Sequence, residues 1–495
     1  MRPSQHFDGP TMVAAADMTT LPTSLAAAAV RDAARREWDV VVIGGGNAGL
    51  VAAITAAEQG CRVLLLEAAE RDLRAGNTRH TRNIRCAHNS PDPYAPGKYS
   101  VDELLGDLRS VGGSPTNPAL AVLTASESES VVPWMETHGV RWQAPLRGTV
   151  GLARTNRFFL GGGKALANRY YRVAEDASVT VLYEARVANF DFDGRRCHPI
   201  VAGVGEEEIR IRTRATVVAS GGFEANLAWL KRYWGPAADN YIVRGTPHND
   251  GSVLARLLDL GAATRGDPQG FHAIAVDARS PKFDGGIATR LDCIPFGIVV
   301  NRDAQRFADE GLDIWPKRYA SWGGLIARQP DQIAYAIIDS QAMGKFIPPL
   351  YPPMRSDTIS GLARTIGLDA RTLNSTVSEF NAHVDRKSEL NPGRLDGVMT
   401  VGLEPAKSNW ACRLDQPPFF ALPLRVGITF TYMGVAVNER AQVLNTAGNP
   451  MPNVFAAGEI MSGNVLTSGY LAGFGMTIGS VFGRIAGREA SRVAA

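Results

Sequence analysis

The chain is poor in the features that mark several broad classes of protein. Its 495 residues hold only five cysteines, which are far apart and form no CxxC pair: Cys61, Cys86, Cys197, Cys293 and Cys412. This number and spacing argue against a disulfide framework and against a cysteine zinc site, so we expect no bound metal. A reducing cytoplasm is the compartment that such cysteine usage favours.

An excess of charge of one sign is also absent. The formal net charge is +3 at pH 7, and Lys and Arg gather only in short clusters such as RDAARRE. Proteins that bind nucleic acid present a basic patch, so the sequence predicts no nucleic-acid partner and favours small molecules. With 45% hydrophobic and 20% charged residues, the chain is expected to bury a large core in two or three units.

Long apolar runs are missing as well, and no run is long enough to span a bilayer. The first residues end near the short stretch LAAAAVRDAARRE and lack the charge and cleavage pattern of a signal peptide. We interpret residues 1–36 as a disordered leader, with Met12 and Met18 as alternative starts. The sequence therefore predicts a cytoplasmic protein.

Glycine, by contrast, is plentiful, and three glycines follow an apolar run near the start. Residues 39–49, DVVVIGGGNAG, indicate a buried strand that breaks into a tight turn with GxGxxG spacing. Gly44 would make the turn, Gly46 would let the backbone approach a pyrophosphate, and Gly49 would let helix and strand pack closely. A helix-compatible segment and a second strand, CRVLLLEA, follow, and Glu67 at its end could accept from ribose hydroxyls. This βαβ context favours a dinucleotide site over a glycine-rich loop without a ligand.

Two later segments indicate which dinucleotide is bound. Residues 215–223, ATVVASGGF, and residues 452–460, PNVFAAGEI, are apolar strands that end in glycine. Flavoproteins with two dinucleotide folds place such strands beside FAD, and the sequence resembles this class. FAD is therefore the predicted cofactor, with Glu459 at the ribityl chain.

The C-terminal segment GMTIGSVFGRIAG spaces four glycines four residues apart, at Gly475, Gly479, Gly483 and Gly487. On a helix they form one smooth face, which predicts close packing against a neighbour. The N-terminus of this helix could also stabilise negative charge on a reduced flavin.

These motifs, taken in order, resemble the fumarate reductase and succinate dehydrogenase flavoprotein superfamily over residues 37–495. Four blocks are most similar to FAD-dependent tricarballylate dehydrogenases, namely GGGNAGLVAAITAAEQG, GNTRHTRNIRCAH, NRDAQRFADEGLDIWPKRYA and GNVLTSGYLAGFGMTIGSVFGRIAG. The flavoprotein part of an aerobic cobalamin-pathway enzyme shares much of this pattern. The resemblance implies an α/β fold, in which residues 37–266 and 432–495 form a two-dinucleotide-fold (Rossmann-like) FAD domain. Residues 267–431 would form an inserted α+β clamp domain.

The resemblance also implies which residues meet the cofactor. Asn77 stands where the covalent members of the superfamily carry a histidine, so the FAD is expected to be bound non-covalently. The positions expected to contact it are Gly44, Gly46, Asn47, Ala48, Gly49, Glu67, Ala68, Asn77, Thr78, Val187, Ala219, Gly221, Glu459, Gly475 and Met476.

A cationic run, GNTRHTRNIRCAH, follows the dinucleotide motif, and its arginines recur every third residue. In a helix they would share a broad face able to present bidentate donors to carboxylates or to the pyrophosphate, and the alternative is a solvated basic face. The expected substrate-binding residues are these arginines together with residues that the resemblance places nearby: Arg79, Arg82, Arg85, Gly162, Gly163, Thr431 and Tyr432.

The chain departs from fumarate reductase at two substrate positions. Phe430 lies at or near the place of a histidine, and Tyr470 corresponds to a carboxylate-binding arginine, which makes fumarate and succinate poor candidates. By resemblance His272 binds substrate and Arg318 transfers the proton. Alternatively, His272 is only a core histidine and Arg318 only binds a carboxylate. Tyr470 or Tyr432 would then be the base.

The expected reaction removes two hydrogens from adjacent carbons of a polycarboxylic acid, as in the conversion of tricarballylate to cis-aconitate. A base takes the proton α to a carboxylate, and the β-hydride goes to flavin N5. One rival is a 3-ketosteroid dehydrogenase, because the segment GYLAGFGMTIG loosely resembles the glycine-rich loop of those enzymes. The other is an electron-transfer flavoprotein without a substrate of its own. Family resemblance suggests a membrane-bound iron–sulfur acceptor, which would place the protein at the periphery of the inner membrane; oxygen and quinone are alternatives.

Overall fold

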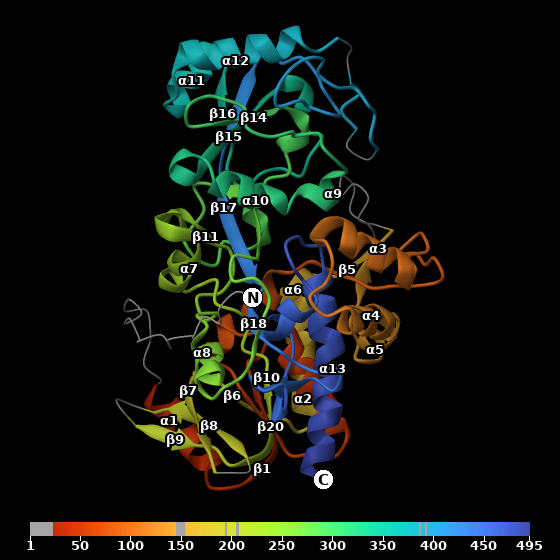
Figure 1. The fold of residues 1–495 in the computed structure, drawn as a ribbon, viewed down its shortest axis with the longest axis vertical. Helices are drawn as coiled ribbons and strands as arrows, with labels where there is room; N and C mark the ends of the chain where they lie inside the picture. The colour runs from red at the N-terminus through yellow and green to blue at the C-terminus, as the bar shows by residue number, and fades with distance from the viewer. Residues whose placement is uncertain (1–22, 145–153, 194–195, 204–206, 386–387, 392–393) are drawn as a thin grey trace.

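The computed structural model describes residues 23–144, 154–193, 196–203, 207–385, 388–391 and 394–495. Figure 1 shows an elongated molecule in two parts, with the long strand β17 (Phe419–Thr431) running from one part into the other. In the lower part, α13 (Phe474–Ala494) runs along the sheet towards the C-terminus.

The lower part is built on a six-stranded sheet in the order β19-β20-β10-β1-β2-β6, in which every pair except β19 with β20 is parallel. Its central strands carry apolar runs, VVVI, ATVV and VLLL, because both faces of the sheet are covered at these positions. The predicted α/β class is therefore correct. In spatial order the strands are β19 (Gln442–Leu444), β20 (Pro450–Ala456), β10 (Thr213–Val218), β1 (Trp38–Ile43), β2 (Val63–Leu66) and β6 (Thr180–Leu182).

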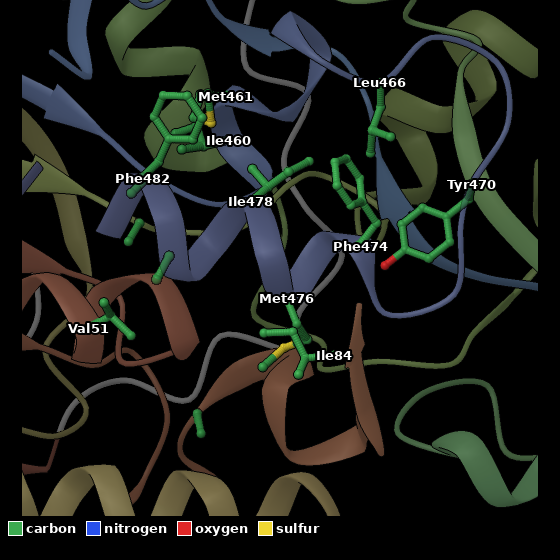
Figure 2. Close-up of a cluster of buried hydrophobic side chains, with 14 of the residues drawn as sticks. Val51, Ile84, Ile460, Met461, Leu466, Tyr470, Phe474, Met476, Ile478 and Phe482 are labelled. Atoms are coloured by element: carbon green, nitrogen blue, oxygen red, sulfur yellow. The ribbon is translucent and has the colours of Figure 1, made fainter. Parts of the chain in front are cut away.

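Helix α13 packs against α2 (Asn47–Glu58) through its glycine face. A Cβ atom on Gly483 would lie 2.7 Å from the carbonyl oxygen of Ala48, and one on Gly487 would lie 2.6 Å from that of Ala52. Figure 2 shows the apolar side of α13, where Ile478 and Phe482 join the buried cluster. The predicted close packing of this helix is confirmed.

The upper part has its own sheet, in which β17 pairs with β11, β13, β15 and β16, and β15 pairs with β14. Helices α11 (Ile359–Ile366) and α12 (Ala370–Ala382) cover it and close a second hydrophobic core. The domain limits of 267–431 stay a prediction, and β11 joins this sheet from before residue 267. The other strands are β11 (Ile242–Val243), β13 (Phe271–Asp277), β14 (Ile298–Asn301), β15 (Ile333–Asp339) and β16 (Met354–Ser356).

Smaller elements connect and flank these two sheets. The helices are α3 (Val101–Gly112), α4 (Pro118–Glu127), α5 (Val131–Thr137), α6 (Gly162–Asp176), α7 (Leu227–Trp234), α8 (Ser252–Asp259), α9 (Trp315–Arg318) and α10 (Ser321–Ala327). The strands are β3 (Asn83–Arg85), β4 (Trp142–Gln143), β5 (Asn156–Phe159), β7 (Val187–Phe192), β8 (Cys197–Ala202), β9 (Glu208–Arg210), β12 (Thr264–Arg265) and β18 (Gly434–Val435).

One part of the expected leader is ordered, which corrects the prediction for residues 24–33. They form α1 (Ser24–Ala33), whose Ala27 and Val30 are buried, because its apolar face packs on the protein instead of meeting water. The carbonyl of Ala33 accepts a hydrogen bond from the Trp38 indole at 3.0 Å. The earlier residues 1–22 lie outside the described part of the chain. Among the helices that are described, none has the length and apolar character needed to cross a bilayer.

Candidate functional site

The turn after β1 has the geometry that the GxGxxG spacing predicts. Gly44 has φ +98°, and a Cβ atom there would lie 2.4 Å from the Ala219 carbonyl oxygen. A Cβ atom on Gly49 would lie 1.8 Å from the Gly44 carbonyl oxygen, so helix and strand depend on glycine here. Gly46 differs, because a Cβ atom on it would meet protein only at 3.4 Å, at the Thr78 hydroxyl. The open side of Gly46 faces a cavity and suits the close approach of a ligand backbone.

This cavity runs from the glycine turn to the start of α13. It is lined by every predicted cofactor-binding residue except Gly49, which packs inside the turn. Asn47 and Thr78 fix its floor, since the Thr78 hydroxyl accepts from the Asn47 N–H at 2.8 Å. The residues present therefore fit a dinucleotide laid along the cavity.

Glu67, at the end of β2, is a buried carboxylate held in one orientation. It accepts hydrogen bonds from the backbone N–H of Ala69 at 2.9 Å, from that of Ala75 at 3.2 Å and from the Tyr171 hydroxyl at 3.3 Å. Oxygen lone pairs remain on the cavity side, which is the arrangement that a ribose-binding acid needs.

Asn77 joins three segments of chain at the cavity wall. Its amide nitrogen donates to Glu224 Oε1 and to the Thr429 carbonyl, both at 2.7 Å, and its amide oxygen accepts from the Thr246 N–H at 2.9 Å. The amide group is not a nucleophile, and its polar atoms are already bonded. It has a structural role and offers no attachment point for a covalent flavin.

Glu224 and Glu459 form a buried carboxyl pair beside this amide. Glu459 Oε1 accepts from the Thr431 N–H at 2.8 Å, and Glu224 Oε1 accepts from the Asn249 amide at 2.8 Å. Burial raises the pKa of both carboxyls, and the neighbouring Glu224 raises the pKa of Glu459 further. The pair therefore retains a proton well above the usual range of glutamate.

Three arginines line the other end of the cavity: Arg82, Arg244 and Arg290. Arg244 follows directly on β11, is 5% exposed, and its Nε and Nη1 have no acceptor among the residues that the structure describes. Arg82 lies over the Phe158 ring at 5.9 Å, and within the described chain its guanidinium also lacks a hydrogen-bond partner. Only Arg290 is paired, through its Nε to Asp292 at 2.7 Å.

These groups leave the cavity end strongly positive. Three guanidinium groups face one carboxylate, so two positive charges are uncompensated. Burial, with Arg290 nearby, lowers the pKa of Arg82 and of Arg244 to about 10, which leaves both charged at neutral pH. Cations shielded from water without ion-pair partners are costly, so this end of the cavity favours an anionic ligand.

Aromatic rings close this end. The Tyr470 ring stacks on His272 with centroids 3.9 Å apart, and the Tyr470 hydroxyl accepts from the Gly475 N–H at 3.0 Å. Figure 2 shows Tyr470 beside the start of α13, near Phe474. Burial raises the pKa of Tyr470, whereas burial together with Arg244 lowers that of His272 well below its ordinary value. His272 is therefore a neutral imidazole.

The arginines of the cationic run do not share a helix face, and that interpretation is wrong. Residues Gly76–His80 form a short 3₁₀ helix, and the chain then extends into β3, because the carbonyls of Thr81 and Arg82 accept from Gly163 and Phe159. Only Arg82 lines the cavity. Arg79 is paired with Asp284. Arg85 donates to the Ala472 carbonyl at 3.1 Å and to the Tyr99 hydroxyl at 2.9 Å.

The other predicted substrate residues lie beside the cavity and not on its wall. Gly163 packs the start of α6 against the 3₁₀ turn, where a Cβ atom would lie 1.9 Å from the Thr78 carbonyl oxygen, and Gly162 precedes it. Thr431 bonds to Glu459, and the Tyr432 hydroxyl donates to the Gly469 carbonyl at 3.0 Å.

Arg318, the predicted proton-transferring residue, is not among the cavity-lining residues. Its side chain is 40% exposed, and its Nε lies 3.8 Å from Asp313. The next residue, Tyr319, lines the cavity instead. The sequence reasoning missed Tyr319, Arg244 and Arg290. A polar residue directly after an apolar run, as in YIVRG, was the available signal for Arg244.

Two comparisons with solved structures show the same fold. A flavocytochrome c3 fumarate reductase in its open conformation matches with a TM-score of 0.73 at 24% identity, over 93% of this chain and 79% of that chain. The 3-ketosteroid-Δ4-(5α)-dehydrogenase of Rhodococcus jostii RHA1 matches with a TM-score of 0.70 at 24% identity, over 92% and 97% of the two chains.

Comparison of the sequence with known proteins identifies the family. The chain is 26% identical over 477 residues to the NADH:fumarate oxidoreductase of Klebsiella pneumoniae (strain 342), covering 93% of this chain and 48% of that protein. It therefore spans about half the length of that relative. A family model described as "FAD binding domain" matches residues 39–475. The chain therefore belongs to the FAD-binding-domain family, and FAD is its cofactor.

Proposed function

We propose that this protein desaturates a polycarboxylic acid of the tricarballylate type, giving the corresponding unsaturated acid. The observation that carries the proposal is the pair of arginines Arg82 and Arg244, which line the same cavity as the cofactor-binding residues and form no salt bridge within the described residues. A substrate with several carboxylates supplies the missing negative charge at this place.

The protein's own groups account for binding and orientation. Guanidinium groups suit bidentate recognition of carboxylates, so Arg82 and Arg244 are assigned to two of them. Arg290, held by Asp292, supplies a fixed positive charge that stabilises the enolate-like charge formed when the α-proton leaves. When bound, FAD supplies the acceptor for the hydride from the neighbouring carbon.

The aromatic wall favours a substrate other than fumarate or succinate. Phe430 and Tyr470 lie with ring centroids 5.8 Å apart at the positions where the superfamily resemblance implies histidine and arginine. A steroid would use these rings, but it would supply no negative charge to Arg82 and Arg244. We also propose, from the resemblance alone, a separate membrane-bound iron–sulfur protein as the electron acceptor.

Anaerobic bleaching of the flavin tests the proposal. The full-length protein is mixed with tricarballylate, with succinate and with 4-androstene-3,17-dione, and the flavin absorbance is followed. We expect fast bleaching with tricarballylate and slow bleaching with succinate. Fast bleaching by the steroid, with none by any polycarboxylate, would move the protein to the steroid dehydrogenases, and no bleaching by any acid would support an electron-transfer role.

Arg244→Met separates charge recognition from general damage. Loss of two charge-assisted hydrogen bonds is expected to weaken tricarballylate binding ~100-fold, as measured by perturbation of the flavin spectrum. The melting temperature should not fall, since a buried charge without a partner is removed. Arg355→Met is the control, because that side chain is 65% exposed and, among the described residues, its ion pair is with Asp357.

A further inference from the structure

Tyr319 lies at the centre of the cationic end of the cavity. Its ring is 4% exposed, with the Arg290 guanidinium 4.2 Å from the ring centroid on one side and the His272 ring edge-on at 5.6 Å. Tyr319 follows directly on α9 and lines the cavity, whereas the side chain of Arg318, the last residue of α9, does not.

The Tyr319 hydroxyl is uncommitted within the described residues, and this sets it apart from the other two tyrosines of the region. The Tyr432 hydroxyl donates to the Gly469 carbonyl, and the Tyr470 hydroxyl accepts from the Gly475 N–H. In the part of the chain that the structure describes, the Tyr319 hydroxyl makes no hydrogen bond. It is not sealed in the core either, since it lines the cavity. A polar group in this state is available to a ligand.

The surrounding charges favour ionisation of this hydroxyl over that of Tyr470. Arg290, Arg244, Arg82 and Arg85 each lower the pKa of Tyr319, although burial raises it more and leaves a neutral phenol as the major form. The pKa of Tyr470 is raised by burial and by a charge on Tyr319, and Arg244 is the one arginine that lowers it. Of the two, Tyr319 is the better acceptor of a proton released beside the arginines.

We propose that Tyr319 exchanges the proton with the α-carbon of the substrate, an inference that rests on the proposed function. In the desaturation the α C–H bond breaks and its proton goes to the Tyr319 phenolate oxygen. The electron pair of that bond forms the new C=C bond, and the β-hydrogen leaves with its electron pair to the flavin. In the reverse direction the phenol returns the proton to the same carbon.

Tyr319→Phe tests this in the full-length, flavin-loaded protein. The change deletes a hydroxyl that leaves no described group unsatisfied, so flavin content and melting temperature should be retained. Tyr335→Phe is the matched control on β15, away from the cavity. Three readouts are taken with tricarballylate: the dissociation constant from the flavin spectrum, the rate of anaerobic bleaching against pH, and deuterium at the α-carbon of acid recovered from D₂O.

For the wild type we expect a bleaching rate that rises with pH through the neutral range, because the phenolate is the minor form there. Tyr319→Phe should keep the dissociation constant within about threefold, bleach at least ~1,000-fold more slowly, lose the rise with pH and take up no deuterium. Tyr335→Phe should match the wild type.

Each other result decides against the proposal in a distinct way. If Tyr319→Phe bleaches at the wild-type rate, Tyr319 is not the base. If Arg318→Lys or Tyr470→Phe shows the selective loss of rate instead, the proton belongs to that residue. If the wild type neither binds nor is bleached by any polycarboxylate, the proposed function itself fails, and the role of Tyr319 in it fails as well.

Discussion

Two neighbouring glycines of the dinucleotide turn have different physical tasks, and substitution should separate them. Gly49 has no room for a Cβ atom, whereas a Cβ atom on Gly46 would project into the cavity without meeting protein closer than 3.4 Å. Gly46→Val is therefore expected to abolish flavin retention while the flavin-free protein keeps its melting temperature. Gly49→Ala should lower the melting temperature itself. The ratio of absorbance at 450 and 280 nm and the melting curves measure both effects, and a flavin-loaded Gly46→Val protein would contradict this assignment.

The carboxyl pair Glu224–Glu459 makes a prediction about pH. Burial and mutual proximity raise the pKa of both groups, so the folded state holds a proton that the unfolded chain releases above the ordinary glutamate range. The stability that the pair contributes is therefore present at low pH and is lost as pH rises through the raised pKa.

Glu224→Gln removes one charge from the pair while keeping an amide oxygen for Asn77 and Asn249. The difference in free energy of unfolding between the variant and the wild type should shift in favour of the variant as pH rises from about 4.5 to 8. Urea unfolding at several pH values measures it. A difference that does not change with pH would show that the pair does not hold the extra proton.

The residues that sequence reasoning found and those it missed differ in how far apart they lie along the chain. The glycine turn and Glu67 belong to one βαβ unit, in which spacing along the chain dictates position in space. Arg244 and Tyr319 reach the same cavity from segments about 160 and 240 residues after Arg82, through the pairing of a second sheet. No local sequence pattern carries that information. The run of three arginines therefore predicted three substrate-binding residues, whereas only Arg82 of the three lines the cavity.

At the scale of elements, α13 and α2 form the contact on which the glycine turn rests. A Cβ atom on Gly483 would press on the Ala48 backbone at 2.7 Å, and backbone cannot move aside as a side chain does. Gly483→Ala should therefore destabilise the protein by about 1–3 kcal/mol, in spite of the higher helix propensity of alanine.

Gly106 provides the matched control for this change. It lies within α3 and is exposed, and a Cβ atom added there would meet no other atom within 4 Å, so Gly106→Ala should stabilise the protein by about 0.5–1 kcal/mol. Thermal and urea unfolding of both variants give the comparison. Equal effects of the two substitutions would mean that the glycine face is not what brings the helices together.

Strand β17 shows why the upper part was harder to predict than the lower one. The apolar strands β1, β2 and β10 follow from their composition alone, whereas β17 contains Pro423, a residue that usually argues against a central strand. The structure accommodates it, because Pro423 pairs with Tyr335 of β15 and its carbonyl accepts from the Ala278 N–H at 2.9 Å. Long-range pairing thus overrode the local signal.

In the molecule as a whole, β17 links the second core to the cofactor cavity. The strand begins among the residues of the second core and ends at Thr431, whose N–H holds Glu459 at 2.8 Å. The Asn77 amide nitrogen, in the 3₁₀ helix Gly76–His80, donates to the Thr429 carbonyl of the same strand at 2.7 Å. Both parts of the molecule therefore meet at the cofactor cavity, and bound FAD should stabilise the two together.

This arrangement gives a prediction for the intact protein. Asn77 offers no nucleophile, so FAD is expected to be held by non-covalent contacts alone, and acid precipitation should release all of it into the supernatant. Because the ligand binds only the folded state, the melting temperature should rise with added FAD. At FAD concentrations a hundredfold above the dissociation constant, the free energy of unfolding should increase by about 2.7 kcal/mol. Flavin fluorescence of supernatant and pellet and melting curves with added FAD test this. Flavin that stays with the pellet would show a covalent bond from a residue other than Asn77.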